Sequence, residues 1–99
     1  MATRKKLPPI HPGQVLAEDL KDGGISMNEL GRALRVPVNR ISEIVNGKRG
    51  VSADTALRLA RYFGTTAQYW LNLQTLYELE ATERSAGKAI QREVIPRAS

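Results

Sequence analysis

The sequence predicts an all-α fold, a single domain of five helices, and three features of its 99 residues support this prediction. Apolar residues recur at positions i, i+3, i+4 and i+7, which is the spacing of one helix face. The segments with this spacing are separated by serine, threonine, proline and glycine, residues that begin and end helices. No stretch alternates apolar and polar residues as a half-buried strand does.

The first two helices are bounded by proline, serine and glycine. Pro12 suits a first helical turn, and the glycine pair 23–24 stops that helix. Ser26 can cap the second helix by accepting from a backbone N–H of the first turn, and Glu29 completes a capping box. Pro37 prevents this helix from continuing. The apolar faces expected for these two helices consist of Val15, Leu16, Leu20, Leu30, Ala33 and Leu34.

The third and fourth helices are likewise bounded by residues that begin and end helices. Pro37 suits the start of the third helix, and residues 46–47, Asn-Gly, end it. Ser52 can cap the fourth helix, and Gly64 terminates it. The inward faces expected here consist of Ile41, Ile44, Val45, Ala56, Leu59, Ala60 and Phe63.

A fifth helix, capped by Thr65 or Thr66, is expected to run to about Gly87 and to fray before it. One apolar stripe on it, about 120° wide, consists of Tyr69, Trp70, Leu73, Leu76 and Tyr77 and is expected to be core. Leu71 and Leu79 fall outside this stripe. They are expected to form a dimer interface, and the alternative is that they are lone exposed leucines, which are common.

Three regions follow from these elements. Residues 1–11 are expected to be an extended arm, because Pro8 and Pro9 forbid regular helix. Residues 12–87 form the helical domain, and residues 88–99 are expected to be a tail with little periodicity.

The net charge of +5 lies entirely in the middle third of the chain. Residues 32–61 carry seven basic side chains against two acidic ones, whereas the flanking segments 1–31 and 62–99 are each balanced, four against four. A cationic patch confined to one folded stretch indicates a polyanionic partner.

Residues 27–46, MNELGRALRVPVNRISEIVN, fit a helix-turn-helix. Apolar residues stand where two short helices would cross, and Gly31 is the small residue at the crossing. The second of these helices would present its outward side chains to the major groove of DNA.

Each outward residue type has a chemical reason to contact DNA. Asn39 can pair with adenine, Arg40 with guanine and Glu43 with cytosine N4, while Val38 can touch a thymine methyl group. The expected base contacts are Pro37, Val38, Asn39, Arg40, Ser42 and Glu43. The expected phosphate contacts are Ser26, Arg32, Arg35, Asn46, Lys48 and Arg49. The alternatives are that Arg40 and Glu43 pair on a solvated face, and that Lys48 and Arg49 are ordinary turn residues.

The residues hold no pattern for catalysis, a metal or another cofactor. His11 is the only histidine, cysteine is absent, and a role in helix start or packing is expected for His11. The serines are better explained as caps or contacts than as nucleophiles. No run approaches the roughly 18–20 apolar residues of a membrane span, and the N-terminus is a poor signal peptide. We therefore expect a cytoplasmic protein with no membrane contact and no small-molecule substrate.

The run RISEIVNGKRGVSADTALRLARYFGTTAQYWLNLQTLYELE closely resembles the HigA-type (VapI-like) antitoxins of the Xre/lambda-repressor-like helix-turn-helix superfamily, and HPGQVLAEDL matches the family's opening helix. The resemblance covers about residues 11–80. It implies a five-helix lambda-repressor-like domain whose second and third helices form the helix-turn-helix. It also implies a homodimer on a palindromic operator, and a cognate HigB-type toxin, an mRNA-cleaving ribonuclease of RelE-like fold.

Two departures from the family pattern concern the turn. Arg35 stands where many members have glycine, and a non-glycine residue in left-handed geometry costs on the order of 1 kcal/mol. Gly31 stands where alanine is common, which keeps the close approach but loosens the helix by up to ~1 kcal/mol.

Two further functional hypotheses stay open at this stage. The chain can be a stand-alone transcriptional repressor with no toxin partner. It can also be a protein-interaction module only, with the arm 1–11 and the fifth helix binding the toxin.

Overall fold

The computed structural model describes residues 8–98 and contains five helices and no strand within that range. The all-α, five-helix prediction is confirmed. The helices are α1 (Pro12–Gly23), α2 (Met27–Leu34), α3 (Val38–Val45), α4 (Ala53–Phe63) and α5 (Ala67–Glu93).

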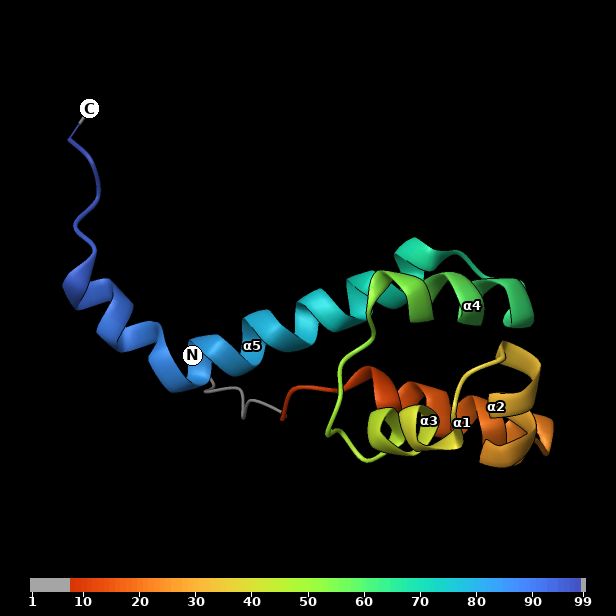
Figure 1. Ribbon diagram of the computed structural model, residues 1–99. Coiled ribbons are helices and arrows are strands. Elements are labelled where there is room, and N and C mark those ends of the chain that lie inside the picture. The colour runs from red at the N-terminus through yellow and green to blue at the C-terminus, as the bar shows by residue number, and fades with distance from the viewer. Residues whose placement is uncertain (1–7, 99) are drawn as a thin grey trace.

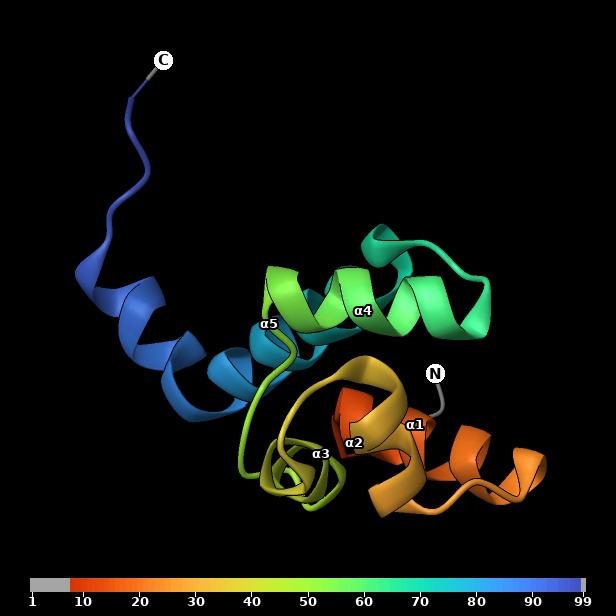
Figure 2. The ribbon, with the colours of Figure 1, turned by 45° about the vertical axis from the view of Figure 1, so that its right-hand side comes forward.

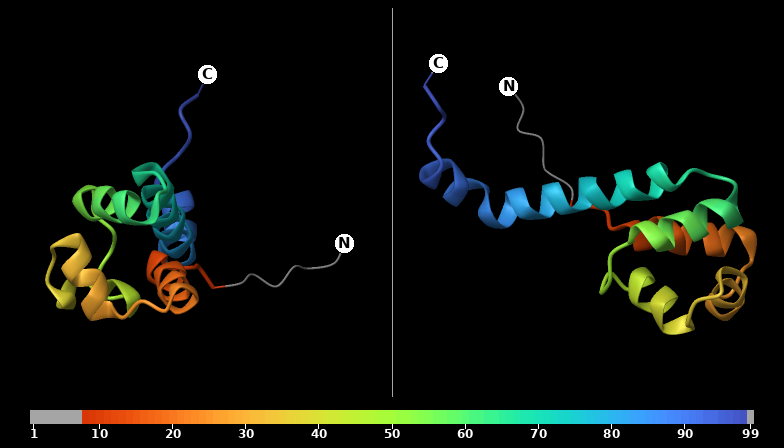
Figure 3. Two further views of the ribbon diagram at one scale, coloured as in Figure 1. Left: turned by 90° about the vertical axis from the view of Figure 1, so that its right-hand side faces the viewer. Right: turned by 45° about the horizontal axis from the view of Figure 1, so that its top comes forward.

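The first four helices and the start of α5 form a compact body, and the rest of α5 projects from it (Figure 1). α4 packs mainly against α5, while α3 packs against α2 and α1. Figure 2 shows α4 on one side of this body, with α1, α2 and α3 grouped on the other. The projecting half of α5 gives the described chain a length of 52 Å against a thickness of 23 Å. The right-hand view of Figure 3 shows this projection from the side.

The expected helix caps are present. The hydroxyl of Ser26 accepts from the backbone N–H of Glu29 at 3.0 Å. Ser52 accepts from the third residue of α4 at 3.2 Å, and Thr66 accepts from the third residue of α5 at 3.1 Å. Of the two threonines that precede α5, Thr66 is therefore the cap. Thr65 instead accepts a hydrogen bond from the Trp70 indole at 3.0 Å.

The core collects the inward faces of all five helices. Trp70 of α5 is completely buried and is among its largest members. The buried apolar residues are Leu16, Leu20, Leu30, Leu34, Ile41, Ile44, Val51, Ala56, Leu59 and Trp70. Three residues expected to face inward do not: Ala33 is exposed, and Tyr69 and Leu76 are 42% and 58% exposed. The stripe on α5 is thus narrower than its periodicity predicts, because Tyr69 and Leu76, seven residues apart, lie together at one edge of it and stay open to solvent.

The predicted end of the fifth helix is wrong. α5 continues through Gly87 to Glu93, so the segment expected to be a tail is helical over residues 88–93. Alanine, lysine, glutamine and arginine in this stretch are good helix formers, and a single glycine lowers helix propensity by only about 1 kcal/mol. Residues 1–7 of the expected arm lie outside the described residues, and residues 8–10 are not helical.

Gly13 allows α1 and α3 to approach each other closely. A Cβ placed on Gly13 would overlap the backbone carbonyl of Ile44 and would lie 3.0 Å from the Cα of Val45. Backbone atoms cannot move aside as the end of a side chain can. Gly13 therefore determines how close α3 lies to the rest of the body.

We predict that Gly13→Ala lowers the free energy of unfolding by about 3 kcal/mol, since overpacking against backbone forces the helices apart. Gly87→Ala is the matched control, because its Cβ would meet nothing nearer than 3.9 Å. That variant should gain about 0.5–1 kcal/mol from the better helix former. Urea denaturation followed by circular dichroism measures both, and a Gly13→Ala protein as stable as wild type would contradict the packing argument.

His11 starts α1 and joins it to α5. Its Nδ1 accepts from the backbone N–H of Gly13 at 2.9 Å, which caps the helix. Its ring meets the Tyr77 ring edge-on, with centroids 4.8 Å apart. Burial lowers the pKa of the His11 imidazole below its ordinary value of 6.5. The expected helix-start role of His11 is confirmed.

We predict that acid destabilises the protein through His11. The unfolded chain takes up a proton near pH 6.5, whereas the folded chain resists it, so the stabilisation is complete above about pH 6.5 and falls as the pH drops. His11→Asn keeps a capping oxygen and does not titrate in this range. Its free energy of unfolding should fall less between about pH 7 and about pH 5 than that of wild type. Parallel curves in urea denaturation across this range would disprove the role of the imidazole.

Candidate nucleic-acid interface

α2 and α3 form a helix-turn-helix whose turn is made without glycine. Arg35 adopts left-handed geometry, with φ 61° and ψ 43°, and is the one non-glycine residue among the described ones with a positive φ. The backbone N–H groups of Arg35 and Val36 donate to the carbonyls of Arg32 and Gly31, at 3.2 and 3.0 Å. These two bonds make a Schellman end for α2. The conformational cost expected for Arg35 is therefore present.

Gly31 lies at the crossing of the two helices, as predicted. It is buried, and a Cβ there would lie 3.1 Å from the Val36 carbonyl oxygen and 3.4 Å from the Val38 Cα. The start of α3 is thus held close against α2. α3 packs its inward face, Ile41 and Ile44, completely into the core.

The opposite face of α3 is open. Pro37, Val38 and Asn39 are exposed, whereas Arg40, Ser42 and Glu43 are half-buried. Ser42 and Asn46 are one turn apart, and the Asn46 amide donates to the Ser42 hydroxyl at 3.4 Å. All six predicted base-contact residues therefore belong to one accessible ridge, which we call the α3 ridge.

Arg40 is held by an ion pair that sequence analysis did not anticipate. Its guanidinium lies 3.3 Å from the Asp54 carboxylate, rather than pairing with Glu43. Asp54 also accepts from Arg58 at 2.9 Å, and Arg58 donates in turn to the Leu34 carbonyl at 2.8 Å. The hydrogen bond from Arg58, and the nearby charges of Arg58 and Arg40, hold the pKa of Asp54 below its usual range. The carboxylate therefore stays ionised between two guanidinium groups.

Glu43 pairs with Arg49, with 2.7 Å between the carboxylate and the guanidinium. The backbone N–H groups of Lys48 and Arg49 both donate to the Glu43 carbonyl, which fixes the loop after α3. Lys48 and Arg49 are exposed beside the α3 ridge. Glu43 thus holds one of the cations expected to contact phosphate.

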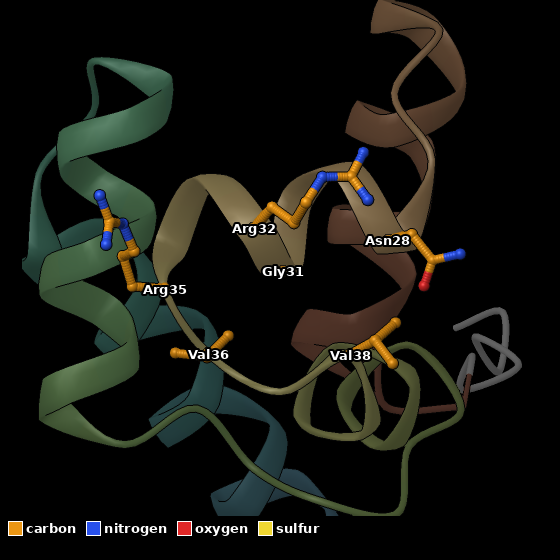
Figure 4. A pocket seen from close by; sticks show the side chains of 6 residues that line it. All are labelled: Asn28, Gly31, Arg32, Arg35, Val36 and Val38. Carbon is orange, nitrogen blue, oxygen red and sulfur yellow. The ribbon is translucent and has the colours of Figure 1, made fainter.

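On the α2 side of the α3 ridge, a hollow of about 360 Å³ opens beside the start of α3. Gly31, Val36 and Val38 form its apolar part, and Arg32 and Arg35 contribute cationic side chains. Figure 4 shows Asn28, which sequence analysis missed, at the rim near Arg32 and Val38. The available signal was spacing: Asn28 precedes Arg32 by four residues and shares its helix face.

The two leucines expected at an interface differ. Leu71 is half-buried and packs against the core, so only part of its side chain is accessible to a second subunit. Leu79 is 57% exposed on the projecting part of α5, where Leu76 is also exposed. The structure thus separates the two residues that the sequence grouped together.

The chemistry of this surface is that of recognition by charge and hydrogen bonds. No group of three histidine, cysteine, aspartate or glutamate side chains able to hold a metal occurs within residues 8–98. Over the same part of the chain, no helix has the length and apolar character needed to cross a membrane.

Comparisons with known proteins agree with this architecture. The helix-turn-helix family model matches residues 16–70. Virulence-associated protein I of Dichelobacter nodosus is 52% identical over 84 residues, which are 84% of this chain and 78% of that protein.

Two solved structures are similar in both sequence and fold. An addiction module antidote protein of the HigA family from Coxiella burnetii has a TM-score of 0.88 and 48% identity, over 92% of this chain and 100% of that one. The antitoxin HigA of Pseudomonas aeruginosa, solved with the higBA promoter, has a TM-score of 0.88 and 45% identity, over 91% and 99% of the two chains.

Proposed function

Because the chain belongs to the HigA-type, VapI-like group of the helix-turn-helix family, we propose that it is an antitoxin that binds its own operator. In this proposal it acts as a homodimer on a palindromic operator and neutralises a HigB-type, mRNA-cleaving toxin of RelE-like fold. The group is one of DNA-binding antitoxins and regulators rather than a family of enzymes.

The observation that carries DNA binding is the α3 ridge with cations on both sides of it. The ridge offers amide, hydroxyl and guanidinium groups at the exposed face of a short helix, which is what the edges of bases require. Arg32 and Arg35 lie on its α2 side, while Lys48 and Arg49 lie on its loop side. The antitoxin HigA of P. aeruginosa, solved with the higBA promoter, supports DNA binding by this chain.

We divide the ridge and its borders by role. Val38, Asn39, Arg40, Ser42 and Glu43, with Pro37 at the helix start, face the bases in the major groove. The positions proposed to contact phosphate are Ser26, Arg32, Arg35, Asn46, Lys48 and Arg49. Ser26 acts through the α2 N-terminus that its side chain caps.

Asn39 and Lys48 should therefore respond differently to substitution. Asn39→Ala should weaken binding to the operator by about 1–3 kcal/mol and relax preference at one base position. Lys48→Ala should weaken binding to all duplexes and reduce the salt slope by about 1. Fluorescence anisotropy on the duplex upstream of the coding sequence, at several salt concentrations, measures both effects.

The matched control is Lys88→Ala, which removes a cation from the distal part of α5. It should leave affinity and salt slope almost unchanged. Equal losses for Asn39→Ala on operator and scrambled duplexes would exclude Asn39 from base readout.

The proposed dimer uses the exposed apolar residues of α5. Leu76 and Leu79 are adjacent on the helix surface and more than half exposed. A two-fold dimer would place two α3 ridges about 34 Å apart, one turn of B-DNA. Leu79 is the better candidate for this interface than Leu71, which already packs against its own core.

We predict that Leu79→Glu shifts the protein from dimer to monomer, because a charge would be buried in the interface. Light scattering coupled to size-exclusion chromatography measures the mass. Ile95→Glu is the control, since Ile95 is 75% exposed after the end of α5. A Leu79→Glu protein that remains dimeric would place the interface elsewhere.

Toxin neutralisation is supported by the family relation rather than by a described surface. A stand-alone repressor is the alternative. We expect the product of the adjacent reading frame to copurify with the chain on co-expression, and to lose ribonuclease activity in the complex. A neighbouring product that neither copurifies nor cleaves mRNA would support the stand-alone repressor, and DNA binding would be unaffected by that result.

A further inference from the structure

A second hollow, of about 610 Å³, lies between α2 and α4. We call it the α2–α4 groove. Its apolar surface comes from Ala33, Leu57 and Tyr62, and its cationic surface from Arg35, Arg58 and Arg61. α2 and α4 contact each other at this end of the molecule, as Figure 1 shows on the side away from the projecting α5.

Two apolar side chains of the groove are exposed to solvent. Leu57 is 63% exposed and Tyr62 is 39% exposed, although both lie beside the well-packed core of α4. Leu57 and Arg61 are four residues apart and share one face of α4. The groove therefore presents an apolar side chain directly beside a guanidinium group.

The groove keeps a net positive charge after its arginine–aspartate ion pairs are taken into account. Asp54 is its one acidic lining residue, and the carboxylate is held by Arg58 and by Arg40. Arg35, Arg58 and Arg61 against Asp54 leave a surplus of two positive charges. That surplus favours a ligand with negative charge.

Arg35 supplies a second reason to treat the groove as a binding surface. Its left-handed backbone costs on the order of 1 kcal/mol, a cost that glycine would avoid. Its side chain lines both the hollow of Figure 4 and the α2–α4 groove. The strained position thus places a guanidinium at the wall that the two hollows share.

We propose that the α2–α4 groove binds an acidic segment of a protein partner. An apolar side chain of that segment packs between Leu57 and Tyr62, and its carboxylates pair with Arg35 and Arg61. A nucleic-acid backbone fits the groove less well, because phosphate and sugar would cover little of the apolar surface of Leu57 and Tyr62. The groove shares Arg35 with the proposed phosphate contacts, and its Asp54 pairs with Arg40 of the α3 ridge.

The test uses the full chain and three short fluorescein-labelled peptides, which alternate glutamate with leucine, glutamate with serine, and lysine with leucine. The glutamate–leucine peptide should bind at least about tenfold more tightly than the other two, a difference of about 1.4 kcal/mol. Leu57→Ser and Arg61→Glu should each weaken it by at least about tenfold. Ile95→Ser and Arg92→Glu are the matched controls and should leave binding unchanged.

Leu57 and Arg61 are exposed, so both variants should fold, which thermal melting checks. Equal affinity for the two glutamate peptides would mean simple charge attraction and would overturn the proposal, as would undiminished binding to Leu57→Ser. A mixed-sequence DNA duplex should bind Leu57→Ser as well as wild type. If Leu57→Ser weakens the duplex as much as the peptide, the groove belongs to a nucleic-acid surface instead.

Discussion

The close backbone contact between α1 and α3 determines the orientation of the whole α3 ridge. Gly13 leaves room for the Ile44 carbonyl, and Ile41 and Ile44 then bury completely. Once that inward face is fixed, helical geometry alone directs Asn39 and Arg40 outward. Gly31 does the same for the start of α3 by allowing α2 to approach it. The position of the α3 ridge, and with it the proposed DNA recognition, therefore depends on two glycines.

Local chemistry is why the sequence predicts the five helices so well. Ser26, Ser52 and Thr66 cap with their own hydroxyl groups, and these bonds need only a few neighbouring residues. The crossing at Gly31 is likewise readable from nearby sequence, whereas the left-handed turn at Arg35 follows from the resemblance to the family. The outward face of α3 follows from the same periodicity, so the exposed ridge could be predicted residue by residue.

Features that depend on distant contacts could not be predicted in this way. Periodicity indicates that Tyr69 and Leu76 face inward, but both lie at one edge of the stripe, and the body covers only the residues beside them. No local rule pairs Arg40 with Asp54, fourteen residues away, rather than with Glu43. The continuation of α5 past Gly87 reflects a balance of small propensities, which a stop signal read from one residue overstates.

In the protein without DNA, the Asp54 carboxylate is the anionic partner of Arg40. Arg40 is already oriented by it, so in the proposed base contact less side-chain freedom of Arg40 remains to be lost. The same carboxylate is 59% exposed, and its bond to Arg40 is long, so the exchange of partners is easy. In the proposed complex, Asp54 is therefore the partner that Arg40 has to leave before it can contact DNA.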